Sequence, residues 1–125
     1  MTLLALALAC ARPSPTRPPD IAFDRDACAW CAMLVSDPRH AAAIVTTSGT
    51  TLPFDDPGCA LHYLAEREPP VLQVWFHDAD GWRTQDDVAF ATGAITPMGS
   101  GLTAVPPGTP GAISVDEARR RVGAE

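Results

Sequence analysis

Proline marks both ends of one helix in the middle of this chain. Asp56-Pro57 combines an N-cap carboxylate with proline at the first helical position, where the N–H that proline lacks would have no partner in any case. Apolar residues then recur at helical spacing over residues 59–64. Pro69-Pro70 ends the pattern, because proline cannot continue a helix. The sequence therefore predicts a short helix that begins at Pro57 and ends before Pro69.

Strand-like segments lie on both sides of this helix. Before it, residues 41–47 and 50–54 are rich in strand formers, and Ser48-Gly49 between them predicts a hairpin. Residues 31–35 form a shorter apolar, strand-like run. Further strands are predicted at residues 71–76, 88–91 and 102–105.

A second helix is predicted near the end of the chain. Ser114 and Glu117 match a capping box, in which the serine hydroxyl caps the backbone and the glutamate reaches back. The helix extends to Val122, and Gly123 can end it. Each half of the chain thus has strands followed by a helix. We expect an α+β fold in which two small ββα-like halves form one compact domain.

The beginning of the chain resembles an export signal. Residues 1–9 are almost wholly apolar, and Cys10 follows a small residue, as in a bacterial lipoprotein signal. The stretch is too short to span a bilayer and lacks a positively charged n-region. A plain secretory leader or a disordered start is the alternative. We expect residues 1–10 to be a lipoprotein-type signal with Cys10 as the lipidated residue.

A proline-rich segment follows this signal. Residues 11–20 contain four prolines, a composition typical of an extended, semi-rigid tether. The folded domain is then expected over residues 21–125. The formal net charge is −6, with no basic cluster, and such a chain is a poor candidate for nucleic-acid binding.

The cysteine count is unusual for an exported protein. Once Cys10 is set aside, Cys28, Cys31 and Cys59 remain, and three cysteines cannot all pair within one chain. At least one thiol must stay free, bind a metal or pair with another chain.

Sulfur donors gather in two segments. Cys28, Cys31 and Met33 lie within six residues, and Met98 lies in the sequence Pro97-Met98-Gly99. Thiolates and thioethers are soft donors that select Cu(I). If the fold brings Met98 over the first segment, these side chains can hold one cuprous ion. Trp30, inside the motif, would then shield the ion from water.

Each of these residues also has a structural interpretation. Met33 in an apolar run could fill the core, whereas Met98 beside glycine in a loop is less expected there. Cys59 lies on the face of its helix that should be buried, which favours a small hydrophobic role over a ligand role. Asp55 and Asp56 are expected to shape the turn and cap the helix.

The spacing Cys28-x-x-Cys31 is ambiguous by itself. It fits a thioredoxin-like redox pair, a plain disulfide or half of a zinc site. A redox pair should begin a helix, but an apolar run follows here. A zinc site needs two more ligands, for which Cys59 and His62 are the available pair.

Taken in order, several landmarks resemble the NosL family of copper-binding lipoproteins, which serve nitrous oxide reductase maturation. The landmarks are Cys28 with Met33, Phe54-Asp55-Asp56 before a helix that contains Cys59, Trp75, Trp82, Pro97-Met98-Gly99 and the helix over residues 114–122. The resemblance implies a periplasmic lipoprotein that binds Cu(I) and hands it to a partner. It also implies a fold similar to that of organomercurial lyases.

The interpretation that follows is a non-enzymatic Cu(I) metallochaperone. Cys28 would supply a thiolate, Met33 and Met98 thioethers, and Cys31 an additional or exchanging donor. Its partner would be a copper-accepting enzyme such as nitrous oxide reductase, or the maturation complex of that enzyme. The protein would be exported and anchored to the membrane on the periplasmic side through Cys10. The alternatives are a thiol–disulfide oxidoreductase using Cys28 and Cys31, and a structural zinc-binding module.

Overall fold

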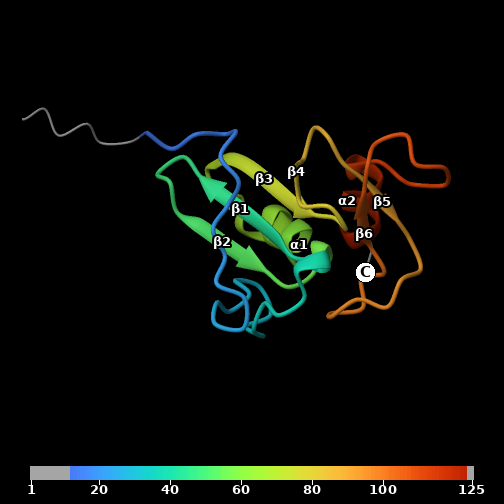
Figure 1. Cartoon of the computed structure of the whole chain (residues 1–125), viewed down its shortest axis with the longest axis horizontal. Helices are drawn as coiled ribbons and strands as arrows, with labels where there is room; N and C mark the ends of the chain where they lie inside the picture. The colour runs from blue at the N-terminus through green and yellow to red at the C-terminus, as the bar shows by residue number, and fades with distance from the viewer. Residues whose placement is uncertain (1–11, 124–125) are drawn as a thin grey trace, which may run out of the picture.

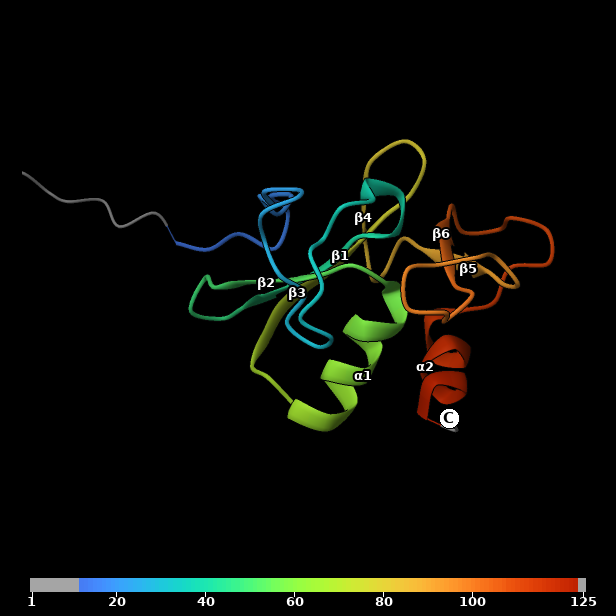
Figure 2. The same cartoon turned by 90° about the horizontal axis from the view of Figure 1, so that it is seen from below.

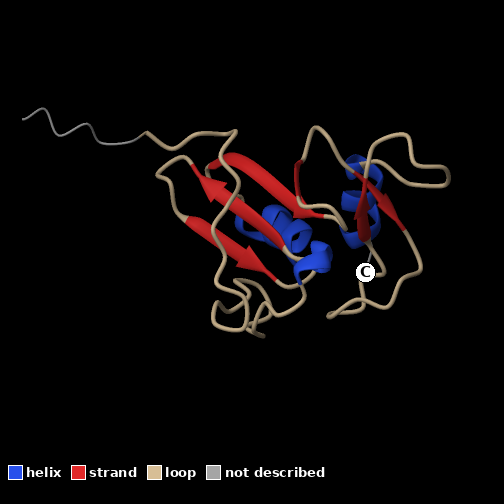
Figure 3. Cartoon of the chain, viewed as in Figure 1, coloured by secondary structure: helices blue, strands red, loops and turns tan. Residues whose placement is uncertain are grey.

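The computed structural model describes residues 12–123. The larger of its two sheets has four strands. Its strands are β1 (Ala42–Thr46), β2 (Thr51–Phe54), β3 (Val71–His77) and β4 (Trp82–Thr84). They are antiparallel in the order β2-β1-β3-β4 (Figures 1 and 3). Strand β1 is central and every one of its residues is buried, which explains its unbroken run of Ala, Ile and Val.

Helix α1 (Pro57–Arg67) lies against one face of this sheet (Figure 2). The Asp56 carboxylate accepts a hydrogen bond from the N–H of Gly58 at 2.8 Å, and Pro57 occupies the first turn. Glu68 ends the helix in the left-handed conformation, with φ of 44°, directly before the two prolines. The predicted helix and its N-cap are therefore confirmed.

The second half of the chain repeats the strand–strand–helix order. Strands β5 (Ala89–Ala91) and β6 (Thr103–Val105) form a separate antiparallel pair, and α2 (Val115–Gly123) follows. Helix α2 packs beside α1 (Figure 2). Phe76 of β3 meets Phe90 of β5 edge to face at 5.0 Å between ring centroids, so one core joins both halves.

The expected α+β class is confirmed, with β1-β2-α1 and β5-β6-α2 as the two ββα units. Strands β3 and β4 extend the sheet of the first unit. A short 3-10 helix, η1 (Pro38–His40), precedes β1.

Two local expectations were wrong. Residues 31–35 do not form a strand; the segment makes only an isolated bridge between Ala27 and Leu34. The capping box is half formed: the Ser114 hydroxyl accepts from the N–H of Glu117 at 3.1 Å. The Glu117 carboxylate instead contacts Arg120, because an arginine at i+3 offers a charged partner.

Residues 12–20 run along the sheet rather than away from it. The side-chain amide of Gln73 donates to the carbonyl of Pro15 at 3.0 Å, and Pro13 lies close to Gly49 in the β1–β2 turn. The expected signal over residues 1–10, with Cys10, lies outside the described residues. Within residues 12–123, no helix has the length and apolar character that crossing a membrane requires.

Candidate metal centre

The loop that carries the first two cysteines is a closed turn. The N–H of Cys28 donates to the carbonyl of Met33 at 2.7 Å, and the N–H of Ala32 donates to the carbonyl of Cys28 at 3.0 Å. Ala32 has a φ of 67°, an uncommon conformation for alanine that turns the chain back on itself. We call residues 27–34 the cysteine loop.

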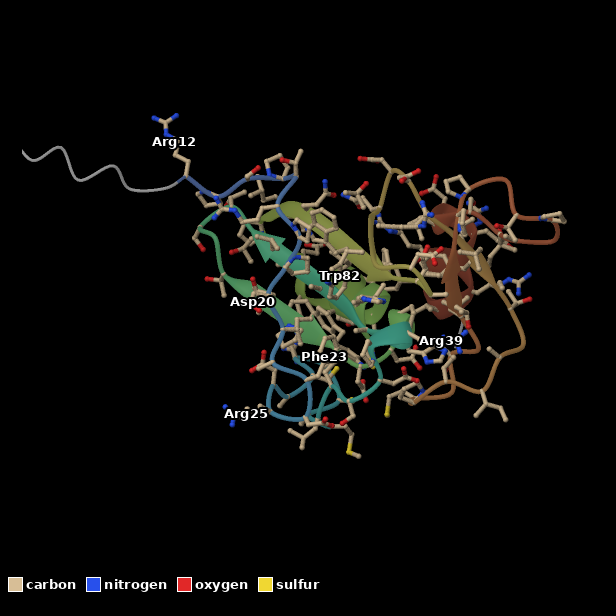
Figure 4. All side chains as sticks on the ribbon, viewed as in Figure 1. Arg12, Asp20, Phe23, Arg25, Arg39 and Trp82 are labelled. Carbon is tan, nitrogen blue, oxygen red and sulfur yellow. The ribbon has the colours of Figure 1, made fainter. Side chains whose placement is uncertain are left out.

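Backbone hydrogen bonding holds the cysteine loop against the sheet. The N–H of Ala29 donates to the carbonyl of Pro53, in β2, at 2.8 Å. Just before the loop, Phe23 packs against the core, whereas the Arg25 side chain points away from the protein (Figure 4). The loop is therefore fixed beside the end of β2, where Asp55 follows and α1 begins.

Three thiols and one carboxylate meet at this junction. The Sγ atoms of Cys28, Cys31 and Cys59 and a carboxylate oxygen of Asp55 all lie within 4.8 Å of one another. The thiol of Cys31 donates to Asp55 Oδ1 at 3.2 Å. The single hydrogen of the Cys59 thiol is shared between the same oxygen, at 3.7 Å from Sγ, and the sulfur of Cys28. We call these four residues the thiol centre.

The spacing of the thiol centre suits a single metal ion. With metal–sulfur bonds of about 2.3 Å, three or four sulfurs on one ion lie about 3.8–4.0 Å apart. The four donor atoms lie within 4.8 Å of one another, so side-chain movements of about 1 Å or less would bring them to one ion. Cys28 and Cys59 are each 3% exposed and Asp55 is 4% exposed, whereas Cys31 is half-buried. Solvent therefore reaches the centre from the side of Cys31.

The environment of Cys28 favours its thiolate. A hydrogen bond from the Cys59 thiol lowers the pKa of Cys28 to about 6, against the opposing effect of burial, with help from the backbone N–H groups of Cys31, Asp55 and Trp30. A thiol with this pKa is largely ionised at neutral pH. Cys28 can therefore bind a metal ion without first releasing a proton.

The other two thiols are held in their protonated forms. Burial raises the pKa of Cys31 to about 11, and the neighbouring Asp55 and Cys28 act in the same direction. The hydrogen bond that Cys59 gives to Cys28, followed by burial, raises the pKa of Cys59 far above its usual range. One negative charge at Cys28 is thus stabilised by two neutral thiol neighbours.

A second loop is bonded to Asp56, the residue that follows Asp55 of the thiol centre. Residues 92–101 connect β5 to the residues before β6, and Met98 lies in this loop, which we call the methionine loop. The N–H of Met98 donates to Asp56 Oδ2 at 2.9 Å, and the Ser100 hydroxyl donates to Asp56 Oδ1. Asp56 therefore caps α1 and also fixes the methionine loop to the start of that helix.

Neither methionine of interest fills the core. Met33 is 59% exposed and Met98 is 49% exposed. The alternative interpretation, in which Met33 fills the core, is therefore wrong. Met33 lies in the cysteine loop itself, and Met98 lies in the loop bonded to Asp56, the residue that follows Asp55; both side chains are open to solvent.

The outer side of the cysteine loop contacts helix α1. The Trp30 ring stacks on His62 with 5.4 Å between ring centroids and an interplanar angle of 5°. The guanidinium of Arg67 lies 5.9 Å from the Trp30 ring centroid. Trp30 thereby attaches the cysteine loop to α1 at a second point. His62 serves this stack and is not part of the thiol centre.

Sequence reasoning identified Cys28 and Cys31 but assigned Cys59 to the core and Asp55 to the turn. Cys59 is buried as expected, yet its sulfur belongs to the thiol centre. Two signals could have pointed to these residues: the third cysteine had no partner, and Asp55 lies four residues before it. Two residues that are four positions apart at the start of a helix have their side chains on the same face of that helix.

The fold and the thiol centre define a class of protein: a small α+β domain with a thiol cluster at the N-terminus of a helix. One solved structure with this fold is the copper chaperone NosL from Shewanella denitrificans, with a TM-score of 0.53 and 20% identity. The alignment covers 86% of this chain and 89% of that chain. No protein-family description and no curated protein matches the sequence. The fold that the sequence resemblance implied is therefore confirmed.

Proposed function

We propose that this protein is a non-enzymatic metallochaperone that binds Cu(I) and transfers it to another protein. The observation that carries the proposal is the convergence of three cysteine sulfurs within 4.8 Å. The exposed thioethers of Met33 and Met98 add two further soft donors to the proposed site. Soft sulfur donors favour Cu(I) over harder divalent ions. The fold shared with a copper chaperone gives independent support.

In this proposal the ligands divide by charge and exposure. Cys28 supplies the thiolate that gives affinity, since its lowered pKa leaves it ionised at neutral pH. Cys31 supplies an additional or exchanging donor from its half-buried position. Met33 and Met98 supply neutral thioethers, which hold Cu(I) weakly enough for release. An ion bound on this side can pass to a partner by stepwise ligand exchange.

The surface around the centre supports transfer to a protein partner. Within residues 12–123, the exposed large apolar side chains are Trp30, Met33, Leu34, Ile95 and Met98. All of them belong to the cysteine loop or the methionine loop. Exposed apolar side chains gathered in this way are typical of docking surfaces. The partner we propose is a copper-accepting exported enzyme, such as nitrous oxide reductase, or the maturation complex of that enzyme.

The proposed location follows from the beginning of the sequence. An apolar stretch that ends at Cys10 supports export and anchoring of the protein by a lipid on the periplasmic face of a membrane. The proline-rich residues that follow would connect this anchor to the domain.

A competition titration tests the proposal. The fully reduced protein is titrated with Cu(I) without oxygen, in the presence of a coloured Cu(I) chelator, and the same is done with Zn(II). We expect about one Cu(I) per monomer and a strong preference for Cu(I), because the donors are soft. Tight Zn(II) binding together with weak Cu(I) binding would refute the chaperone proposal.

One observation favours zinc as a second candidate. Three cysteines and Asp55 supply four donor atoms, the coordination number of structural zinc sites. The two ions differ in their use of Asp55 and Met98: Zn(II) accepts a carboxylate, whereas Cu(I) prefers a thioether. Asp55→Asn should weaken Zn(II) binding more than Cu(I) binding, and Met98→Leu should weaken only Cu(I) binding. This pair of variants separates the two candidates.

A further inference from the structure

We infer that Cys59 is a metal ligand and forms, with Cys28, an inner position of the centre that retains the ion. The inference rests on the proposed function and deepens it. Ligand exchange at the surface explains how an ion enters and leaves, but not what holds it between partners. The buried residues of the thiol centre, Cys28 and Cys59, would hold the ion between these steps.

Geometry places Cys59 among the ligands rather than beside them. Its sulfur lies within 4.8 Å of the sulfurs of both Cys28 and Cys31, close to the spacing that a shared ion requires. Its thiol already points into the centre, because it donates to Asp55 Oδ1 at 3.7 Å.

Burial divides the centre into two positions. Cys28 and Cys59 are each 3% exposed, so an ion between them is closed off from water. Cys31 is half-buried, and the thioethers of Met33 and Met98 are exposed. An ion could therefore pass from the thioethers to Cys31 and then to the inner pair, with Cys31 as the ligand common to both positions.

The two positions have different consequences for transfer. Loss of an outer thioether removes a neutral donor from the route of exchange. Loss of Cys59 removes an inner ligand whose bond to the ion must break before the ion can leave. We therefore expect Cys59 to act mainly on the rate of release, which is where most affinity differences between related complexes arise.

Cys59→Ser tests this role, with Ala60→Ser as a matched control. Ala60 is the next residue of α1 and is fully buried, so its substitution also introduces a hydroxyl into the first turns of the helix. Cu(I) affinity is measured by chelator competition, and release is measured by stopped-flow transfer of Cu(I) to excess chelator. We expect Cys59→Ser to lose at least about tenfold in affinity and to release the ion faster by a similar factor, with Ala60→Ser unchanged.

A measurement on the unaltered protein keeps the inference testable if Cys59→Ser fails to fold. Ag(I) is a redox-stable substitute for Cu(I), and its magnetic nucleus couples through bonds to the β-protons of a ligating cysteine. We expect cross-peaks from silver to the β-protons of Cys28 and Cys59. Cross-peaks to Cys28 without any to Cys59 would overturn the inference.

The outcomes also separate this inference from the proposed function. If the unaltered protein fails to bind Cu(I), the chaperone proposal fails and the inner position fails with it. If the unaltered protein binds Cu(I) and folded Cys59→Ser binds and releases it equally well, the chaperone proposal stands and the role of Cys59 is refuted.

Discussion

The Asp56 carboxylate accepts a hydrogen bond from the backbone N–H of Met98, which is 42 positions further along the chain, with 2.9 Å between Oδ2 and N. Its other oxygen, Oδ1, accepts from the N–H of Gly58 at the start of α1. One fully buried side chain thus positions both the helix that carries Cys59 and the loop that carries Met98. The two halves of the fold meet at this carboxylate.

Asp56→Asn separates these two tasks. Asparagine is as good an N-cap as aspartate, so the amide oxygen can still serve Gly58. Its NH2 group cannot accept from the N–H of Met98, so the methionine loop loses this hydrogen bond and keeps only the one from Ser100 to the remaining oxygen. We expect Cu(I) affinity to fall as it does in Met98→Leu, while the helix content measured by circular dichroism stays the same. Asp56→Ala removes the contacts to Gly58, Met98 and Ser100 together and should cost about 2–4 kcal/mol of stability in denaturant unfolding.

Met98→Leu tests whether the thioether is a ligand. Leucine has nearly the same apolar volume, and such a swap costs under about 1.5 kcal/mol even in a core. Met98 is 49% exposed, so the variant should fold as the parent does. We expect Cu(I) affinity to fall at least about tenfold, or about 1.4 kcal/mol, and to fall further in Cys28→Ser, which also removes a charge. Unchanged affinity in Met98→Leu would confine the site to the cysteine loop and its neighbours.

The free energy of unfolding should vary with pH because the pKa values of Cys28 and Cys31 differ between the folded and unfolded chain. The pKa of Cys28 is lowered from 9.0 to about 6, so the unfolded chain binds more protons at this site between those pH values. Stability from Cys28 is therefore fully present above pH 9 and is lost as the pH falls towards 6. The pKa of Cys31 is raised from 9.0 to about 11, so its contribution is present below pH 9 and is lost as the pH rises towards 11.

Unfolding of the metal-free protein across this pH range provides the measurement. Cys28→Ala should remove the rise in stability between about pH 6 and pH 9, because no thiol then ionises there in the folded state alone. Cys59→Ala should raise the pKa of Cys28, since the hydrogen bond from Cys59 is the largest cause of its lowering. Thiolate absorbance follows this shift directly. A Cys28 that titrates near its ordinary value in the unaltered protein would contradict the assignment.

Oxidation should abolish copper binding. All three described cysteines are free thiols, and Cys28 and Cys31 lie close enough in the thiol centre to pair after modest movement. A disulfide lacks the thiolates that bind metal. Thiol counting and Cu(I) titration, before and after mild oxidation, decide the matter. Full Cu(I) affinity in protein shown to contain a Cys28–Cys31 disulfide would contradict the proposed ligands.

Local sequence signals were sufficient for the elements that they mark. Asp56-Pro57 and Pro69-Pro70 bound α1, and Ser48-Gly49 lies in the turn between β1 and β2, because these residues act on their own backbone. The thiol centre depends instead on the hydrogen bond between Ala29 and Pro53, which joins distant segments. No local pattern encodes such a contact, so the unpaired third cysteine and the spacing of Asp55 were the only signals for the proximity of Cys59 to Cys28.

The apolar run at residues 31–35 is a second case in which local sequence did not determine the structure. Its composition predicted a strand, but Met33 and Leu34 are exposed beside the thiol centre. Apolar character ordinarily indicates burial. Here, under the proposed function, the same residues meet an ion and a partner protein, and only the three-dimensional position of the loop distinguishes these uses.

The attachment of the cysteine loop by Pro53 and by the stack of Trp30 on His62 has a consequence for the working cycle of the protein. Both contacts are made by the chain itself, and Phe54, Phe76 and Phe90 are fully buried in an apolar core. Small zinc domains, by contrast, unfold when their metal is removed. Under the proposed function, the protein should therefore remain folded after it delivers its ion, so that one molecule can serve many rounds of transport.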